Sequence, residues 1–386
     1  MKAAWTRSVS SAPLVVGLAA TLAAQQPPPL DNMLGRARPR LSAAADTNDW
    51  ETYFDYAVDQ LRRSPDRARL AFYWAARLDP RRAEPLYGRW VAYWIGRSAW
   101  WKVYLDEDPK FLESPTIVAV DSLYTRALFR NPLVPQTLDV LLYDQLPGQW
   151  SYDPVTSALL SYSAGRFPEA ASQLGSVLKK HPWQHPWLHY HRALAFTGMQ
   201  QWDSALVEVN LLLSYLRTTD TANLSTTYES REMVYYMVGL LHAARGDVAS
   251  GRQALEQALV ENLSFFPAHL VLALMATDRG DSPAAVRELS QALELSRGEP
   301  WVRFEYGRAL SRAGDPGAAV GQLDSVVQDE PFFADAYLEL AVAEENAGSP
   351  QAALVAYQRF LQSAPRREVG EIEQAHARVA VLSGPK

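Results

Sequence analysis

The sequence of 386 residues contains no cysteine. This absence excludes disulfide bonds, zinc sites with cysteine ligands, a thiol nucleophile and an N-terminal cysteine that could carry a lipid. Lysine is scarce as well, because only six of the 37 basic residues are lysine and the rest are arginine. The formal net charge is −6 and no long basic block occurs, so nucleic acid is not an expected partner.

Catalytic motifs are also missing. The sequence has no glycine-rich phosphate loop, no Gly-x-Ser-x-Gly motif and no cysteine–histidine pair. The acidic pairs Glu344/Glu345 and Asp329/Glu330 fit solvated faces of helices or turns better than general acid–base pairs. We therefore expect a protein that is not an enzyme and needs no cofactor. Its hydrophobic content of 48% is too high for wholesale disorder.

A long apolar run occurs only near the N-terminus. Lys2 and Arg7 precede the apolar residues 12–24, which are fewer than the ~20 residues of a membrane-spanning helix. Small residues end the run, so the pattern predicts a secretory signal peptide cleaved near Ala24 and a protein exported to the periplasm or cell surface of a bacterium. An uncleaved anchor and a buried helix are the alternatives. Residues 25–48, rich in proline, predict a flexible linker.

Glycine recurs at a fixed spacing in the C-terminal third. Gly246, Gly280, Gly314 and Gly348 are each separated by 34 residues, and the next residue is aspartate or serine every time. Glycine ends a helix by adopting a left-handed conformation, and aspartate or serine caps the start of the next helix. Small residues also recur seven positions before and five positions after each glycine, followed by larger apolar residues. The pattern predicts pairs of closely packed helices.

This pattern resembles the tetratricopeptide repeat family. Four consecutive units share its 34-residue register: 232–265, 266–299, 300–333 and 334–367. The match departs from the family at Leu263 and Arg297, where the unit usually closes with proline, and at Gly251, which weakens a helix. The resemblance implies an all-α fold, a right-handed α-solenoid whose concave face is lined mainly by the first helix of each pair and binds another protein or an extended peptide.

The domain organisation that we expect follows this register, which continues less regularly upstream. The predicted parts are a signal peptide (1–24), a flexible linker (25–48), divergent repeats with an insertion near 97–113 (49–150), further repeats (151–219), a loop (220–231), four regular repeats (232–367), and a capping helix with a tail (368–386).

The resemblance also implies which side chains line the concave face. Most of them are aromatic, and tyrosine and tryptophan suit binding hot spots because they offer large rigid contact areas. Eleven of the 12 tryptophans lie at or before residue 202, which favours an N-terminal half specialised for contact. The alternative is that these side chains form the core between helices. The predicted partner-binding residues are Trp50, Tyr53, Tyr87, Trp94, Tyr152, Tyr162, Trp187, Tyr190, Tyr236, Trp301 and Phe304.

Four of the seven histidines lie within residues 181–191. His185 and His189 are one helical turn apart and could chelate a metal ion. No acidic residue is interleaved with them and no His-Glu-x-x-His motif occurs, so histidines on a surface or an interface are the favoured interpretation. We therefore expect no metal site.

The leading functional hypothesis is a scaffold or adaptor of the bacterial cell envelope that binds another protein through the aromatic concave face. The alternative from another class is a module that binds cell-wall or capsular glycan, because the same rings could stack on sugars. Self-association through exposed aromatic rings is a further possibility. The identity of the partner does not follow from the sequence.

Overall fold

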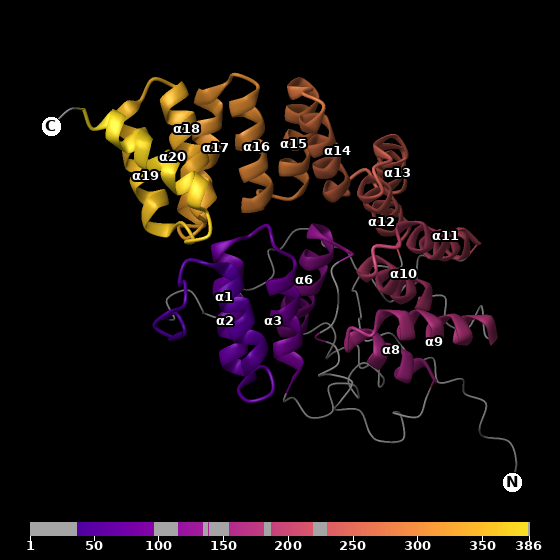
Figure 1. The fold of residues 1–386 in the computed structure, drawn as a ribbon. Helices are drawn as coiled ribbons and strands as arrows, with labels where there is room; N and C mark the ends of the chain where they lie inside the picture. Colours follow the sequence, from indigo (N-terminus) through magenta and orange to yellow (C-terminus); the bar gives the residue numbers. More distant parts are fainter. Residues whose placement is uncertain are drawn as a thin grey trace, which may run out of the picture. The chain divides into compact units, whose positions relative to one another are not determined.

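The computed structural model describes residues 37–95, 115–133, 138, 154–180, 187–218 and 230–384. These residues form 17 α-helices and no strand (Figure 1), which confirms the predicted all-α class. None of the helices in this part of the chain is both long and apolar enough to cross a membrane. The predicted signal peptide and the predicted insertion near 97–113 lie outside the described residues.

The chain divides into two compact units. Of the described residues, unit 1 comprises those between 90 and 254, and unit 2 comprises 37–89 and 255–384. Helices α3 (Glu84–Trp94) and α13 (Val248–Glu261) each cross from one unit to the other. The N-terminal and C-terminal segments of the described chain therefore belong to the same unit.

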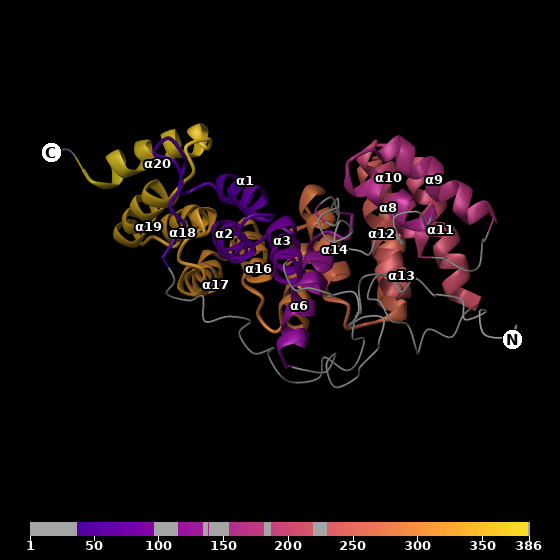
Figure 2. The same ribbon diagram turned by 90° about the horizontal axis from the view of Figure 1, so that it is seen from below.

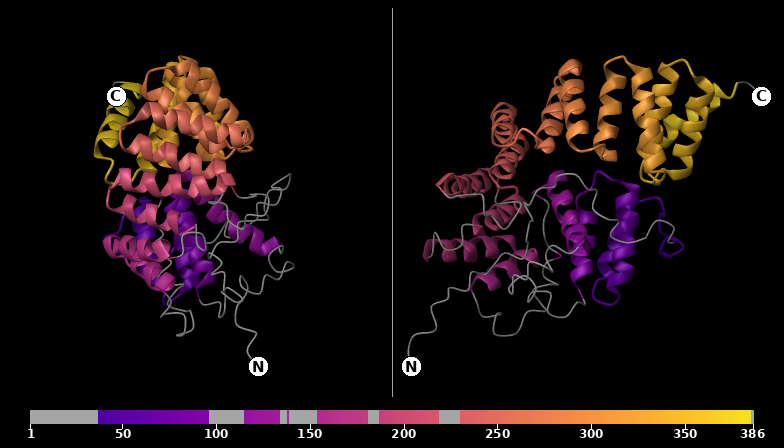
Figure 3. Two further views of the ribbon diagram at one scale, coloured as in Figure 1. Left: turned by 90° about the vertical axis from the view of Figure 1, so that its right-hand side faces the viewer. Right: turned by 180° about the vertical axis from the view of Figure 1, so that it is seen from behind.

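Most of unit 2 is a row of helices that follow one another along the chain. Each helix packs on the one before and the one after it, as the right-hand view of Figure 3 shows. This arrangement of stacked helix pairs is an α-solenoid of helical repeats. The helices are α14 (Phe266–Asp278), α15 (Ser282–Leu295), α16 (Pro300–Arg312), α17 (Pro316–Asp329), α18 (Ala334–Asn346), α19 (Pro350–Ser363) and α20 (Val369–Leu382).

The turns within the helix pairs use glycine and aspartate as predicted. The four turn glycines have φ between +74° and +89°, which a side chain disfavours. Asp315 Oδ1 accepts a hydrogen bond of 3.0 Å from the Ala318 amide, and the aspartates of the two preceding turns cap their helices in the same way. Ser349 differs from the prediction, because its side chain makes no capping hydrogen bond.

Small residues allow the two helices of a pair to approach closely. A Cβ atom added to Gly307 of α16 would lie 2.7 Å from Leu323 Cγ of α17, so the glycine is required by packing. The equivalent Ala273 and Ala341 are fully buried. The predicted seam of small and large residues is therefore the core of this row.

Helix α20 covers the last repeat. Its residue Ala375 is buried, and Ile372 and Val379 pack against the cluster that contains Tyr357 and Phe360. The apolar side of α19 is thus shielded from water by one further helix, as expected for a terminal cap of a repeat array.

Unit 1 contains α6 (Pro115–Arg130) and a second series of helix pairs, and Figure 2 shows the helices of this series grouped together. The series consists of α8 (Pro154–Ser163), α9 (Phe167–Lys180), α10 (Leu188–Gly198), α11 (Trp202–Thr218) and α12 (Arg231–Ala244), and each helix packs on the next. Residues that the repeat register placed in the seam are buried here as well: Ala158, Ala170, Leu174, Ala193, Ala205 and Leu212.

The remaining helices of unit 2 are α1 (Trp50–Gln60) and α2 (Pro65–Leu78), which pack on each other as a helical hairpin. Asp49 caps α1 through a hydrogen bond from the Glu51 amide. The prediction of a flexible linker does not describe residues 37–48, because the Arg38 guanidinium donates to the Thr47 carbonyl and lies over the Trp74 ring. Hydrophobic periodicity does not reveal an irregular segment that is held by polar contacts.

Candidate protein-docking site

The aromatic residues predicted to bind a partner are core residues in the described structure. Ten of the eleven are at most 8% exposed, and Tyr152 lies outside the described residues. Within unit 1, the Tyr190 hydroxyl donates to the Pro132 carbonyl (2.8 Å) and the Tyr236 hydroxyl donates to the Phe129 carbonyl (3.2 Å), so both rings are anchored internally. Burial raises the pKa of Tyr236. A partner-binding role for these residues stays a prediction. Such a role would require exposed rings, and the described rings are buried.

A different set of side chains meets where the two ends of unit 2 pack together. One side is the N-terminal hairpin, by which we mean α1, α2 and the flanking residues 38–49 and 79–82. The other side is the repeat edge, defined as residues 330–335 between α17 and α18 together with residues 362–368 between α19 and α20. The two sides are more than 240 residues apart in the sequence, so their contact is a tertiary feature of unit 2.

An aromatic contact lies at the centre of this interface. The rings of Trp74 on α2 and Phe332 on the repeat edge meet edge to face, with their centroids 5.0 Å apart. The Arg38 guanidinium lies 4.9 Å from the Trp74 ring centroid and 4.7 Å from that of Phe332. The neighbouring Phe333 receives the Arg81 guanidinium at 5.0 Å. Arginine over an aromatic face is a favourable cation–π arrangement.

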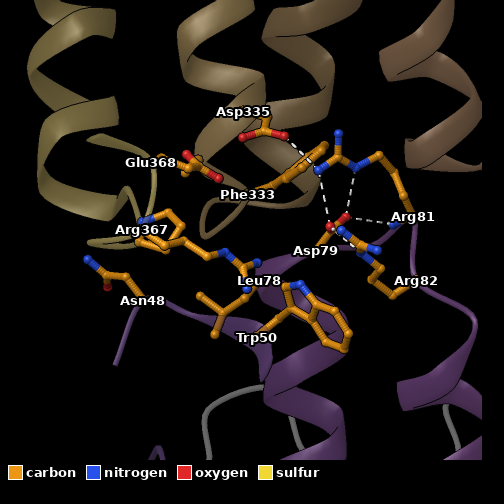
Figure 4. Close-up of a pocket in the computed structure, with 12 residues that line it drawn as sticks. Asn48, Trp50, Leu78, Asp79, Arg81, Arg82, Phe333, Asp335, Arg367 and Glu368 are labelled. Carbon is orange, nitrogen blue, oxygen red and sulfur yellow. Dashed lines mark hydrogen bonds and ion pairs between the residues drawn. The ribbon is translucent and has the colours of Figure 1, made fainter. Parts of the chain in front are cut away.

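Ion pairs surround the aromatic contact. Arg77 lies 3.0 Å from Glu330, and both side chains are less than a fifth exposed. Arg81 bridges Asp79 of its own segment (2.8 Å) and Asp335 of α18 (2.6 Å), as Figure 4 shows. In the two pairs that cross the interface, the arginines belong to the hairpin and the carboxylates of Glu330 and Asp335 belong to the repeats. The two surfaces therefore have complementary charge at these positions.

The second loop of the repeat edge holds the segment that precedes α1. The Asp46 carboxylate accepts a hydrogen bond of 2.6 Å from the Arg366 amide. The Asn48 side-chain amide donates to the Gln362 carbonyl (3.1 Å). Arg367 pairs with Asp49 at 3.1 Å, and the same guanidinium reaches Glu51. Side chains of the hairpin thus satisfy backbone groups in the last turn of α19 and in the loop after it.

A cavity of about 50 Å³ lies between the two sides (Figure 4). Its lining includes Trp50, Arg82, Phe333, Arg367 and Glu368. This volume has room for a few water molecules and is far smaller than a site for a drug-sized ligand. The interface therefore resembles a contact between proteins more than a small-molecule site.

Two carboxyl groups at this interface have pKa values shifted in opposite directions. Burial raises the pKa of Asp79, but the hydrogen bonds and charges of Arg81 and Arg82 outweigh it, so the net pKa lies below its ordinary value. Burial, together with the nearby charge of Asp335, raises the pKa of Glu368 to about 7. Asp79 is therefore ionised at neutral pH, whereas Glu368 titrates there.

The histidine cluster shows no metal-binding geometry within the described residues. His189 Nδ1 lies 2.7 Å from Glu208 Oε2, and Arg192 donates to the other oxygen of this buried carboxylate. Burial lowers the pKa of His191 to about 4, so this ring is neutral at physiological pH. His185 lies outside the described residues, and the described ones contain no group of three candidate ligands.

Comparison with known families identifies the repeats. A family model described as tetratricopeptide repeat matches residues 236–300 and 305–368. These residues are tetratricopeptide repeats. The match covers α14, α15, α17, α18, α19 and most of α16, and it stops before α20. It includes the whole repeat edge, so the N-terminal hairpin packs on the matched repeats of its own chain. None of the curated proteins matches the chain.

Several solved structures of tetratricopeptide repeat proteins are similar to the chain. The C-terminal part of such a protein from Cytophaga hutchinsonii has 14% identity and a TM-score of 0.49, covering 59% of this chain and 87% of that one. YrrB, described as having an unusual peptide-binding site, has 17% identity and a TM-score of 0.41, covering 53% and 98%. A Parabacteroides merdae protein has 15% identity and a TM-score of 0.37, covering 75% and 100%. Such values say nothing about a shared ligand.

Sequence reasoning missed the residues that form the interface between hairpin and repeat edge. Two signals were visible in retrospect: two adjacent phenylalanines, Phe332 and Phe333, stand in a turn, and Arg77 follows Trp74 at helical spacing. Neither signal indicates that the phenylalanines of the turn contact the residues of α2. Contacts between segments so far apart follow no local period, and only the fold brings these residues together.

Proposed function

We propose that this chain is a protein-binding scaffold without catalytic activity. The observation that carries the proposal is the match of residues 236–300 and 305–368 to tetratricopeptide repeats, folded as stacked helix pairs. A helical repeat array presents an extended surface made by many helices, which suits recognition of another protein. The described residues add no constellation of nucleophile, base and oxyanion donors that would suggest a reaction.

We further propose that the scaffold acts in the bacterial cell envelope. The support for this is the N-terminal pattern of Lys2, Arg7 and the apolar residues 12–24, which is typical of an export signal. The absence of cysteine agrees with a protein whose packed core alone provides stability in an oxidising compartment. Fractionation of the native host, with antibody detection in periplasmic and cytoplasmic fractions, tests the location, and a purely cytoplasmic signal contradicts it.

The partner is expected to be a protein rather than a glycan. Stacking on sugars needs exposed aromatic faces, and the ten described candidate rings are at most 8% exposed. Crosslinking in the native host, followed by purification of the chain and mass spectrometry, tests this. The expected result is one reproducible partner protein crosslinked to residues of the repeats. Retention of the purified chain on peptidoglycan or polysaccharide, without any crosslinked protein, contradicts the scaffold proposal.

A further inference from the structure

The first loop of the repeat edge, residues 330–335, is an acidic and aromatic surface that already holds a protein segment. It presents the carboxylates of Glu330 and Asp335 and the Phe332 ring, and in the structure these groups contact Arg77, Arg81 and Trp74 of the hairpin. The complementarity is therefore observed in atomic contacts, which identifies the chemistry that this edge recognises. Nothing in these contacts depends on the occupant being part of the same chain.

The contact between hairpin and repeat edge combines apolar packing with ion pairs that are exposed to different degrees. The Arg81–Asp335 pair is between a quarter and a third exposed on both sides, and the Arg367–Asp49 pair is 39% and 15% exposed. Ion pairs with this much solvent contact stabilise an interface only weakly. The edge-to-face contact of Trp74 and Phe332 adds modestly to their apolar burial. A second segment with the same charges and an aromatic ring can compete for these partly exposed ion pairs.

We propose that the repeat edge is a docking site for an arginine-bearing helical segment of a partner protein, and that the N-terminal hairpin is its resident competitor in cis. This inference rests on the proposed scaffold function and names the site and the chemistry of its ligand. The occupant has an aromatic residue and, three positions later on the same helix, an arginine, with a second arginine in the turn that follows the helix, as in Trp74, Arg77 and Arg81. The aromatic ring meets Phe332, and the arginines meet the two carboxylates.

Because the hairpin belongs to the same chain as the repeat edge, a partner needs a minimum affinity to displace it. A tethered ligand acts at an effective concentration of about 1 mM, so a partner at micromolar concentration must bind about 1,000-fold more tightly than the hairpin to replace it. Weakening the hairpin therefore opens the site to weaker ligands. Ionic strength is expected to act in the same direction, because salt screens the partly exposed ion pairs.

A synthetic peptide of residues 64–82, labelled with fluorescein, is the probe for this site. It carries Ser64, α2 and both arginines, and its binding to the full chain is followed by fluorescence anisotropy. In the released variant, Arg77→Glu with Arg81→Glu, the hairpin is repelled by Glu330 and Asp335 and the site is vacated. We expect the released variant to bind the peptide at least about tenfold more tightly than the wild-type chain does.

Two matched variants control this experiment. Arg63→Glu with Arg67→Glu makes the same change of charge at exposed positions near the turn of the hairpin, and it should bind the peptide as the wild type does. Adding Glu330→Arg and Asp335→Arg to the released variant should abolish peptide binding, because the site then repels arginine. Circular dichroism establishes that each variant is helical, and Arg77→Gln with Arg81→Gln replaces the released variant if that one unfolds.

Equal affinity of the wild-type and released chains for the peptide, or no binding by a folded released chain, overturns the proposal. Binding that survives the reversal of Glu330 and Asp335 overturns it as well. The experiment involves no native partner. A negative result of the peptide experiment therefore does not contradict the scaffold function. A failed search for a partner protein likewise does not contradict this docking site.

Discussion

At the scale of single residues, Gly307 illustrates how the repeats depend on small side chains. The position faces Leu323 Cγ at a distance that no Cβ atom tolerates, and this atom is the branch point of the leucine rather than a flexible end. In contrast, Gly321 on α17 has no atom within 4 Å of an added Cβ. The two glycines thus provide a matched pair of sites, one constrained by packing and one free.

We predict that Gly307→Ala lowers the free energy of unfolding by about 1–2 kcal/mol, because the strain of the added methyl exceeds the gain in helix propensity. Gly321→Ala should raise it by about 0.5–1 kcal/mol, because alanine restricts the unfolded chain and favours the helix. Urea denaturation monitored by circular dichroism measures both changes. Equal effects of the two substitutions would show that the seam does not limit packing here.

Glu368 is the residue from which we expect a visible pH dependence. Its pKa of about 7 lies above the ordinary value because of burial and the charges of Asp335 and Glu371, which Arg367 and Arg81 only partly offset. The folded state therefore holds a proton over a pH range in which the unfolded state has lost it. Stability from this group is present at low pH, falls as the pH rises between about 4.5 and 7, and is level above that range.

Glu368→Gln removes this titration. We predict that the variant gains stability relative to the wild type at pH 8 and gains less at pH 5. The difference should be on the order of 1 kcal/mol, because Glu368 is only half-buried and solvent screens its charge. Thermal unfolding of both chains at the two pH values measures it. A constant offset between the chains at both pH values would mean that Glu368 has an ordinary pKa.

At the scale of helices, the caps decide where one element of a repeat ends and the next begins. Asp315 makes a capping hydrogen bond to α17, whereas Ser349 stands at the equivalent position of α19 without one. We predict that Asp315→Ala lowers the free energy of unfolding by about 1 kcal/mol and that Ser349→Ala changes it by less than about 0.5 kcal/mol. Urea denaturation again provides the measurement, and equal losses would contradict the difference between the two caps.

Elements were also the part of the structure that the sequence predicted best. The spacing of Gly246, Gly280, Gly314 and Gly348 is a local signal, and the helices, left-handed turns and buried seam follow from it. The sequence did not predict whether the aromatic rings face a groove or the core. Helical spacing alone is compatible with a ring such as Trp301 lying in an open groove or in the seam between helices. Only the position of the neighbouring helices decides between the two, and in the structure Trp301 is 5% exposed.

At the scale of the molecule, unit 2 joins the beginning of the described chain to its end. Asn48 and Gln362 share a hydrogen bond across 314 residues of sequence. Such a contact depends on the summed geometry of all the intervening helices, so no pattern in the sequence predicted it. The described candidate aromatic rings of the N-terminal half are buried, and a partner-binding role for them stays a prediction.

We proposed that the repeats bind a partner protein, and the resemblance to tetratricopeptide repeats implies that the first helix of each pair faces this partner. Val342 on α18 and Val355 on α19 are 37% and 57% exposed, on the first and second helix of the same pair. A photoreactive amino acid placed at either position in the native host tests the claim. We predict a crosslinked partner protein from position 342 and none from position 355. Equal crosslinking from both positions, or crosslinking from 355 alone, would contradict it.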